Sequence, residues 1–501
     1  MRKLVALLLA LSLVLGLAST AFAAKDYTLD IYWIGNKDDE EIRKGVEEAV
    51  SEYVEPLIKA KVAYHIINWD DWTEKALKPL LEDEKIDLIF TADWRDYVQE
   101  ILANKLLPLD DQLEQNGKDI LETLPQAFLD GAKFNGVLYG IPTNKELCVP
   151  SGLIVNKTAA EQIGWDPEKD PVKTTEELEP YLAKYKEMFP DRYPYLMDGQ
   201  NGRWADEPWA PDWAGMENNC VAMKMAADEN GEFDETIYSI YETDEQEAHI
   251  RLMRKWAEAG YISPEAANPD FDYNKVFGTG EFLVFTQPLK GNNIKSVEMY
   301  GANKAPDVPD FELCEIILQD KYLVTNQAGG SMFAIPKTGK AKAAMKYLNL
   351  MHSDPTLVNL MLYGKEGVNY KKVNDQQVEL IDDANWYGLH GGAWTVGNTK
   401  LQYVLTTEDP EKNAMLQSYA DDAKKTASYG FRLDRSKCQE QLDAVAEVVK
   451  KYERGLMVGA VDPDDPELGL EAFRKALKDA GIDELKAEVE AQYATWKDSL
   501  K

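Results

Sequence analysis

Strands and helices alternate along the first hundred residues, and this alternation constrains the fold more than any other feature of the chain. Apolar residues at every second position predict strands at Leu29–Trp33 and Val62–Ile66. A third run, Ile86–Phe90, is continuously apolar, as in a strand that is buried on both faces. Residues 38–49 and 72–81 carry apolar side chains at helical spacing. This order predicts a parallel, doubly wound α/β sheet with helices on both faces.

The length of the chain requires more than one such unit. A chain of 501 residues exceeds what one hydrophobic core usually holds, so we expect at least two domains. Helical periodicity returns near the C-terminus, at residues 435–454, 470–480 and 483–496. The chain carries 88 acidic and 55 basic residues, a formal net charge of −33. A surface this acidic repels nucleic acid and anionic lipid, so we expect neither as a partner.

The first 23 residues have the pattern of a secretory signal peptide. Arg2 and Lys3 form a basic start, and Leu4–Leu17 is an apolar run too short to span a membrane. Ala21–Ala23 reads as a small-x-small cleavage site, so the mature chain is expected to start at Ala24. The pattern predicts an extracytoplasmic protein, periplasmic or secreted after signal-peptide cleavage.

The cysteines indicate neither a lipid anchor nor a metal site. A bacterial lipoprotein would carry its lipid-bearing cysteine directly after Leu17–Ser19, where this chain has Thr20, which cannot form the thioether. No pair of cysteines has C-x-x-C spacing, which argues against zinc-ribbon and thioredoxin sites. Two disulfides are possible in an oxidising compartment, but we expect buried free thiols. The four are Cys148, Cys220, Cys314 and Cys438.

The carboxyl ends of the three predicted strands each carry a tryptophan beside Asn or Asp. Sites in open α/β sheets lie at this edge. Indole faces stack on the apolar faces of a sugar ring, and nearby acceptors bind its hydroxyls. Any one of these tryptophans could equally belong to the core, but the three together favour a site lining. The candidates are Trp33, Asn36, Trp69, Asp70, Asp93 and Trp94.

A second group of tryptophans lies in residues 199–215, among Gly, Asn, Asp and Pro, which predicts a loop. Aromatic side chains gathered on a loop favour contact with a ligand, and the alternative is a plug that fills a domain surface. We expect Trp209 and Trp213 to face the strand-end tryptophans from the other side of the ligand.

Sequence motifs of enzymes are missing from the chain. It has no G-x-S-x-G, H-E-x-x-H, Walker A or G-x-G-x-x-G pattern. An EF-hand-like spacing occurs at Asp270–Glu281, but Lys275 occupies the position where the sharp turn needs glycine. We therefore expect a protein that is not an enzyme and holds neither cofactor nor metal. The histidines show no ligand spacing either: His65, His249, His352 and His390.

Several motifs, in their order along the chain, resemble those of bacterial extracellular solute-binding proteins of the sugar-binding type. Gly136–Pro142, G-V-L-Y-G-I-P, resembles the signature that precedes the crossing between lobes. Gly364–Tyr370 and Trp394–Asn398, W-T-V-G-N, resemble a subgroup of long lipoprotein binders, the LipO type, from which Thr20 departs. Further matches are Leu106–Asp111, Val155–Lys157, Ile163–Gly164, Thr174–Leu178 and Ala334–Leu350.

The resemblance implies an α/β, two-lobed periplasmic-binding-protein fold: doubly wound sheets, a hinge between the lobes, and added C-terminal helices. It also implies a monomer that captures a carbohydrate, expected to be an oligosaccharide, between closing lobes and delivers it to ABC permease subunits at the membrane. Crossings near Cys148, Gly329 and Tyr363 would divide the chain as follows. After the signal peptide 1–23, the first lobe holds 24–148 and 330–364, and the second holds 149–329 and 365–501 with the C-terminal helical region.

The resembling motifs add two candidate ligand-binding residues. Glu366 lies on a glycine-flanked turn and is expected at the hinge or rim, with a purely structural turn as the alternative. Trp394 is expected to form an aromatic floor with Trp33 and Trp94.

Two other functions remain open from the residues alone. An exported glycoside hydrolase on a (β/α)₈ barrel would need eight strand–helix units, and residues 160–280 supply too few strands. A peptide-binding component of an importer is the second, because a groove of tryptophans and carboxylates also suits a cationic peptide.

Overall fold

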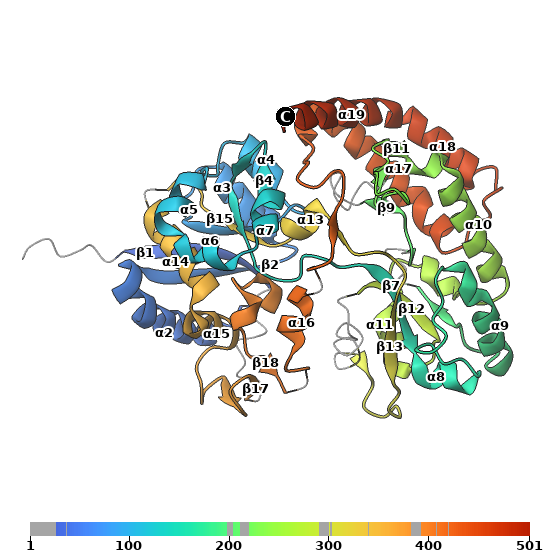
Figure 1. The fold of residues 1–501 in the computed structure, drawn as a ribbon, viewed down its shortest axis with the longest axis horizontal. Helices are drawn as coiled ribbons and strands as arrows, with labels where there is room; N and C mark the ends of the chain where they lie inside the picture. Colours follow the sequence, from blue (N-terminus) through green and yellow to red (C-terminus); the bar gives the residue numbers. More distant parts are fainter. Residues whose placement is uncertain are drawn as a thin grey trace, which may run out of the picture.

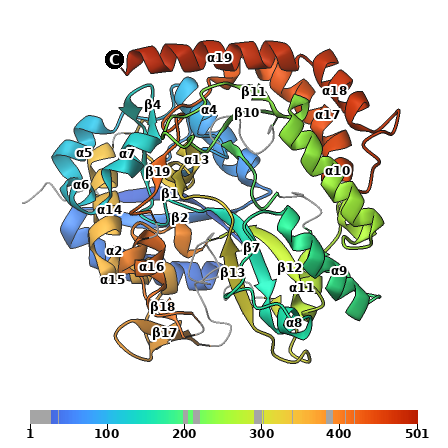
Figure 2. The same ribbon diagram turned by 45° about the vertical axis from the view of Figure 1, so that its right-hand side comes forward.

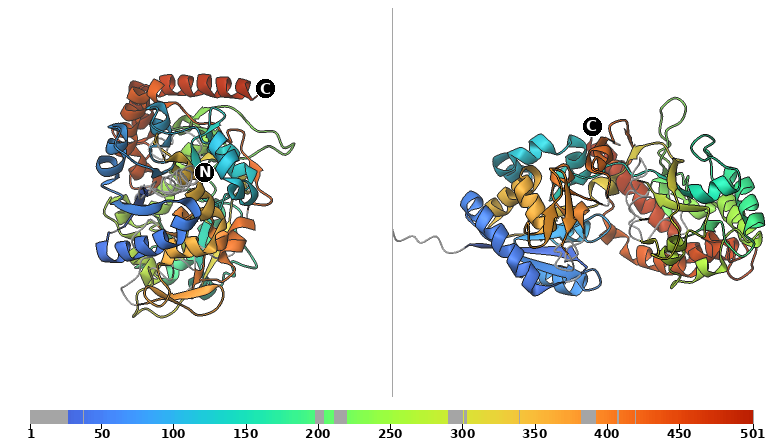
Figure 3. Two further views of the ribbon diagram at one scale, coloured as in Figure 1. Left: turned by 90° about the vertical axis from the view of Figure 1, so that its left-hand side faces the viewer. Right: turned by 90° about the horizontal axis from the view of Figure 1, so that it is seen from below.

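The computed structural model shows two lobes side by side, joined by segments that pass between them (Figure 1). Figure 3 shows the same two bodies from below, with the connections in the middle.

Within the described residues, no helix is both long and apolar enough to cross a membrane. The structure describes residues 27–36, 38–197, 204–210, 220–289, 300, 303–338, 340–381, 392–406, 408–418 and 420–500. The predicted signal peptide 1–23, Trp213 and His390 lie outside these ranges.

The first lobe is built on a five-stranded sheet. Its order is β2 (Lys61–Asn68), β1 (Thr28–Gly35), β3 (Leu88–Thr91), β15 (Met332–Ala334) and β6 (Gly140–Pro142). Strand β1 runs parallel to β2 and β3, while β15 runs antiparallel to β3 and β6. The strand–helix alternation is therefore confirmed, and a late strand from far along the chain completes the sheet.

Helices pack around this sheet and share one core with it. Side chains from α14 and β2 meet inside that core, where the hydroxyls of Tyr64 and Tyr347 are 2.7 Å apart. The helices of the first lobe are α2 (Glu40–Ile58), α3 (Lys78–Leu81), α4 (Tyr97–Leu102), α5 (Asp110–Asn116), α6 (Lys118–Thr123), α7 (Gln126–Ala132), α14 (Ala341–Ser353) and α15 (Pro355–Tyr363).

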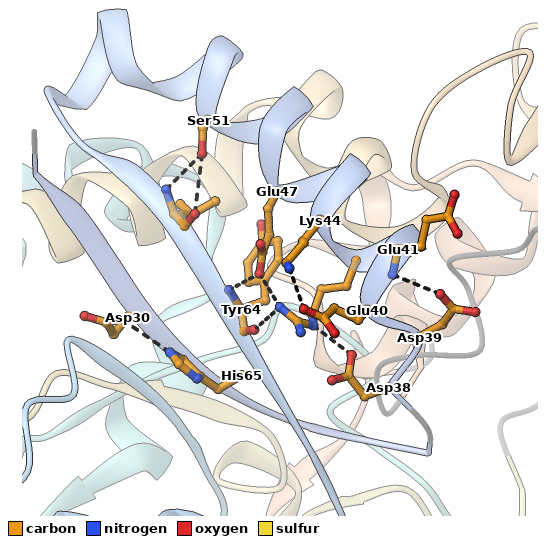
Figure 4. Close-up of polar contacts among 12 residues, drawn as sticks. Asp30, Asp38, Asp39, Glu40, Glu41, Lys44, Glu47, Ser51, Tyr64 and His65 are labelled. Atoms are coloured by element: carbon orange, nitrogen blue, oxygen red, sulfur yellow. Dashed lines mark hydrogen bonds and ion pairs between the residues drawn. The ribbon is translucent and has the colours of Figure 1, made fainter.

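Helix α2 also protects the outer edge of the sheet (Figure 4). The Glu47 carboxylate accepts the Tyr64 backbone N–H at 2.7 Å, and Arg43 donates to the Tyr64 carbonyl at 3.2 Å. The Ser51 hydroxyl accepts the Val62 N–H at 3.1 Å. These side chains satisfy backbone groups of the edge strand β2 that have no neighbouring strand. The helix begins after Asp39, which accepts the N–H groups of its first turn.

The second lobe has a smaller sheet and a larger share of helices. The sheet order is β13 (Leu313–Ile317), β7 (Ser151–Asn156), β12 (Val284–Pro288) and β8 (Tyr195–Leu196). Strand β7 runs antiparallel to both of its neighbours. The helices around it are α8 (Lys157–Gln162), α9 (Glu179–Met188), α10 (Asp244–Glu258) and α11 (Tyr273–Thr279).

The C-terminal helices complete the second lobe and share a core with its middle segment. Val221 and Ile250 pack in one cluster with Leu442, Phe473 and Leu485. Figure 2 shows these helices beside α10, along the outside of the lobe. The elements are β9 (Trp209–Ala210), β10 (Val221–Lys224), β11 (Tyr238–Ser239), α17 (Gln439–Met457), α18 (Leu470–Asp479) and α19 (Ile482–Ser499).

The chain passes from the first lobe to the second for the last time near residue 430. Residues 365–381 and 392–405 pack on the first lobe, because Tyr370, Val378 and Val396 belong to its core. Tyr429 is still part of that core, whereas Phe431 belongs to the second-lobe cluster. This corrects the expected assignment of 365–501 to the second lobe and the expected crossing near Tyr363. The segment consists of β16 (Tyr370–Lys372), β17 (Gln377–Leu380) and β18 (Val404–Leu405), followed by α16 (Lys412–Ser418).

A short parallel pair of strands lies where the second and third crossings run together. Strand β14 (Tyr322–Leu323) pairs with β19 (Lys424–Lys425), and α13 (Thr325–Ala328) follows β14. The Thr325 hydroxyl donates to the Ser428 carbonyl at 3.1 Å and accepts the Gly430 N–H at 2.8 Å. The two crossings are thus bonded to each other.

The four cysteines are all buried and free.

Candidate functional site

The carboxyl ends of β1, β2 and β3 lie at one edge of the first-lobe sheet. Because β15 runs antiparallel to β3, the second crossing enters the sheet at this same edge through Gly330. The first crossing leaves from it after β6, where the Thr143 N–H donates to the Ser331 carbonyl at 2.9 Å. The edge therefore faces the connections to the second lobe, which is where a ligand held between two lobes has to lie.

Three indoles gather at this edge and form what we call the indole platform: Trp69, Trp94 and Trp394. The ring centroids of Trp69 and Trp94 are 5.9 Å apart with 29° between the planes, and those of Trp69 and Trp394 are 6.2 Å apart with 25°. Phe90 lies within 6.2 Å of both Trp94 and Trp394. All three indoles are partly exposed. The platform thus presents aromatic surface on a packed aromatic base.

Hydrogen bonds hold two of the indoles by their N–H groups. Trp69 Nε1 donates to Asn36 Oδ1 at 2.9 Å, and Trp94 Nε1 donates to the Gly330 carbonyl at 2.8 Å. Arg95 donates to the Trp69 carbonyl at 2.8 Å, and its guanidinium lies 5.8 Å from the centre of the Trp94 ring. Because both N–H groups are engaged, ring faces are what these two indoles offer to a ligand.

Two exposed polar residues lie at the strand ends beside the platform, and one buried acid lies on helix α4 of the same lobe. Asn36 and Asp70 are both exposed at the strand ends, and Asn36 Oδ1 already accepts the Trp69 indole N–H. Glu100 of α4 is fully buried, and neither of its carboxyl oxygens has a hydrogen-bond partner. Burial, assisted by the charge of Asp96, raises the pKa of Glu100 to about 8, so this carboxyl is protonated at pH 7.

Two of the predicted site tryptophans are core residues. Trp33 is 0% exposed, and its Nε1 donates to the Thr395 hydroxyl at 3.1 Å inside the first lobe. Trp209 is buried in the second-lobe cluster, where its Nε1 donates to Gln246 Oε1 at 3.0 Å. Both sit in regular strands with their rings packed inward, which corrects their expected place in the site lining. The structure favours the core and plug alternatives for them.

Asp93 is already engaged by another side chain, and Glu366 lies on an exposed turn. Both carboxylate oxygens of Asp93 accept hydrogen bonds from Arg432, at 2.6 and 2.7 Å, so Asp93 does not present an open acceptor to ligand hydroxyls. Glu366 is exposed on the turn after α15. Lys365 beside it reaches Gly45, which places this turn next to α2.

Sequence reasoning missed Arg95, Gly330 and Arg432. Arg95 follows Trp94 directly, so a basic residue beside a strand-end tryptophan was an available signal. Gly330 and Arg432 reach the site from distant parts of the chain, and Arg432 is 339 residues from its partner Asp93. No local pattern marks such a contact.

A hollow of about 570 Å³ lies on the outer edge of the second-lobe sheet. It is lined by residues around Pro171 and by strand β13 and its end, up to Leu318. This lining contains no aromatic side chain, and it lies at the far edge of the sheet from β8. The indole platform is therefore the better candidate for a site that stacks on a ring.

Among the residues that the structure describes, no group of three or more His, Cys, Asp or Glu is arranged to hold a metal ion. The Asp270–Glu281 segment forms the short helix α11, with Asp272 accepting the Lys275 N–H at 3.2 Å. That carboxylate is used as a helix cap.

With this geometry in place, comparison with known proteins assigns the chain to a family. Residues 61–385 match the family model described as bacterial extracellular solute-binding protein, and the chain belongs to that family. Residues 427–498 match a second model, a domain of unknown function (DUF3502). A carbohydrate ABC transporter substrate-binding protein of Streptococcus pneumoniae serotype 4 is 24% identical over 476 residues, which are 93% of this chain and 90% of that protein.

Solved structures confirm the two-lobed fold. The N-glycan transport solute binding protein NgtS of S. pneumoniae is 21% identical, with a TM-score of 0.78 over 95% of this chain and 100% of that one. Its complex with Man5GlcNAc has the same identity and coverage and a TM-score of 0.66. An extracellular solute-binding protein of Bifidobacterium longum subsp. infantis is 15% identical, with a TM-score of 0.62 over 95% and 100% of the two chains.

Proposed function

We propose that this protein captures an oligosaccharide between its two lobes and delivers it to the permease subunits of an ABC importer. The observation that carries the proposal is the indole platform at the edge from which the crossings leave. Its three indoles are partly exposed while two of its N–H groups are already bonded. Such a surface suits the apolar face of a pyranose ring better than a flexible charged chain.

The energetics favour a ligand with several rings. Each stacking pair contributes ~0.5–1.5 kcal/mol beyond the burial of area, so three neighbouring indoles can bind more than one sugar unit. The exposed Asp70 carboxylate would accept hydrogen bonds from the hydroxyls at the rim of such a ligand, and the Asn36 side-chain amide, whose oxygen holds Trp69, would donate through its Nδ2. In this proposal Trp69, Trp94 and Trp394 stack, while Asn36 and Asp70 orient. Glu366 stays a proposed rim residue.

The relatives support this choice of ligand class and role. The curated relative is named as a carbohydrate ABC transporter protein, and NgtS is described with Man1GlcNAc and Man5GlcNAc. Capture without chemical turnover fits the family, whose members bind solutes, and delivery to a permease fits the transporter to which the relative belongs. We infer a non-enzymatic, extracytoplasmic binding protein that meets the membrane through its importer.

A thermal-shift and calorimetry screen tests the proposal. The ligands are Man5GlcNAc, a set of neutral oligosaccharides and a lysine-rich peptide. A ligand at 100 times its Kd should add about 2.7 kcal/mol to the stability of the folded protein. We expect an oligosaccharide to give this shift and Trp394→Ala to abolish it. Trp496→Ala serves as the control, since Trp496 is a partly exposed tryptophan that packs on Phe431.

Stabilisation by the peptide and by none of the sugars would contradict the proposal and favour a peptide importer. Release of shorter sugars from a bound oligosaccharide would contradict the non-enzymatic role.

A further inference from the structure

Asp93 joins the first-lobe sheet to both later crossings. It follows β3 by two residues and precedes Trp94 of the platform. Its N–H donates to the Gly329 carbonyl at 2.9 Å. Its carboxylate accepts from Arg432 Nε at 2.6 Å and Nη2 at 2.7 Å, a two-pronged pair of side chains that are 10% and 3% exposed.

Arg432 reaches this point from the end of the third crossing. Its Nη1 donates to the Lys133 carbonyl at 2.8 Å, and its guanidinium lies 5.6 Å from the centre of the Tyr97 ring. Burial opposes the charge on Arg432, but the neighbouring Asp93 carboxylate outweighs it and holds the pKa of Arg432 above its ordinary value. Asp93 is thus the main charge partner of Arg432.

The second crossing runs directly across this pair. A Cβ on Gly329 would lie 1.9 Å from Asp93 Oδ2 and 2.7 Å from Arg432 Nη2, so only glycine allows the approach. The next residue, Gly330, accepts the indole N–H of Trp94. Hydrogen bonds thus join the second crossing to both Asp93 and Trp94. Arg432 binds Asp93 from the third crossing.

We propose that Arg432 is a positioning residue of the binding site: it holds Asp93, and through Asp93 it fixes Trp94 against the second crossing. A shift of the crossings then moves the platform, and a ligand stacked on the platform biases the crossings. This inference rests on the proposed function for the ligand and goes beyond it for the mechanism. It also gives a role to the segment 427–498, whose matching model has no known function. The segment completes the second lobe and supplies the residue that ties the first-lobe site to the crossing.

The experiment compares Arg432→Lys with a matched Arg474→Lys control. Lysine keeps the charge but loses the planar fork. Arg474 also bonds through three nitrogens, to Tyr241, Glu471 and Glu247, and all of these partners lie within the second lobe. Hydrogen–deuterium exchange is measured on the ligand-free proteins, and Man5GlcNAc binding by calorimetry and stopped flow. Paired fluorophores on α6 and α9 report the distance between the lobes.

We expect Arg432→Lys to raise exchange at residues 91–96 and 325–331, to weaken Man5GlcNAc binding at least tenfold through faster dissociation, and to reduce the ligand-induced change in the distance between the lobes. Arg474→Lys should change none of these. Should Arg432→Lys not fold, the neutral double variant Asp93→Asn with Arg432→Gln takes its place, because it removes both buried charges.

Unchanged exchange at residues 91–96 in the folded variant would overturn the proposal whatever the ligand does. A lower melting temperature with unchanged affinity and unchanged lobe movement would also overturn it, because that is the result of a purely structural pair. Failure of the wild-type protein to bind Man5GlcNAc contradicts the proposed glycan alone, and the exchange measurement then decides on Arg432.

Discussion

Removal of a tryptophan from the first lobe has two different costs, depending on where its ring lies. Trp33 is fully buried, so Trp33→Ala should destabilise the protein by ~3–5 kcal/mol through a cavity and lost packing. Trp69 is already partly exposed, so Trp69→Ala should cost less stability but weaken oligosaccharide binding at least tenfold, or ~1.4 kcal/mol. Urea denaturation and calorimetry on both variants separate the two effects. Normal binding by folded Trp69→Ala would contradict the platform.

The buried carboxyl of Glu100 makes stability depend on pH. Its pKa is about 8 in the folded protein and near the ordinary value of a glutamate in the unfolded chain, so the folded state binds the extra proton between these values. The contribution of Glu100 to the free energy of unfolding is therefore fully present below pH ~4. It falls as the pH rises toward 8, by at most ~1.4 kcal/mol per pH unit.

Glu100→Gln should remove this dependence of stability on pH. The free energy of unfolding of the variant should therefore rise relative to that of the wild-type protein between pH 6 and 8.5. Denaturation at pH 7, 8 and 8.5 avoids the opposite effect of His249 and His352, whose buried rings have pKa values of about 3. Their effect lowers stability as the pH falls below ~6.5, because the histidines of the unfolded chain then gain a proton and the buried rings do not. If the free energies of unfolding of the two proteins changed in parallel with pH, Glu100 would have to find a charge partner when it ionises.

The same residues show which parts of the site a sequence can predict. Trp33 shares the parity of Leu29 and Ile31 in β1, so its inward direction follows from the alternation that identified the strand. Trp69 lies one residue beyond β2, and Trp94 three beyond β3, where that alternation no longer applies. Trp394 joins them only because the chain stays with the first lobe after α15, as the core residues Tyr370, Val378 and Val396 show. Local periodicity predicts an element and its buried face, and it holds no information on segments that arrive from hundreds of residues away.

At the scale of the element, helix α2 both covers the sheet and closes its edge. Glu47 accepts the Tyr64 N–H, so Glu47→Ala leaves that group without a partner and should cost ~0.5–1.5 kcal/mol. It should also expose strand β2 to pairing with other molecules. Glu48→Ala is the control, because Glu48 is an exposed neighbour on the same helix.

We expect thioflavin-positive assemblies and a concentration-dependent elution volume after mild heating for Glu47→Ala, and for Glu48→Ala the behaviour of the wild-type protein. Equal aggregation of both variants would indicate that lost charge, rather than the opened edge, drives association.

At the scale of the whole molecule, the two lobes should close on the ligand. The ligand can shift this equilibrium only by binding the closed arrangement better. The chain superposes better on the structure of NgtS described without a glycan, at a TM-score of 0.78, than on the complex with Man5GlcNAc, at 0.66. We therefore expect small-angle scattering to show a smaller radius of gyration on addition of a bound oligosaccharide. An unchanged radius in a sample shown by calorimetry to be saturated would contradict closure.

The path of the chain between the lobes also determines the order in which the protein can fold. Strand β15 enters the first-lobe sheet 190 residues after the end of β6, at Met332 against Pro142. The second-lobe cluster unites Val221 with Leu485, which is close to the C-terminus. At a synthesis rate of ~5–20 residues per second, the gap before β15 alone takes about 10–40 s. Neither lobe is complete until its late segment arrives, so each lobe can finish folding only after most of the chain has been synthesised.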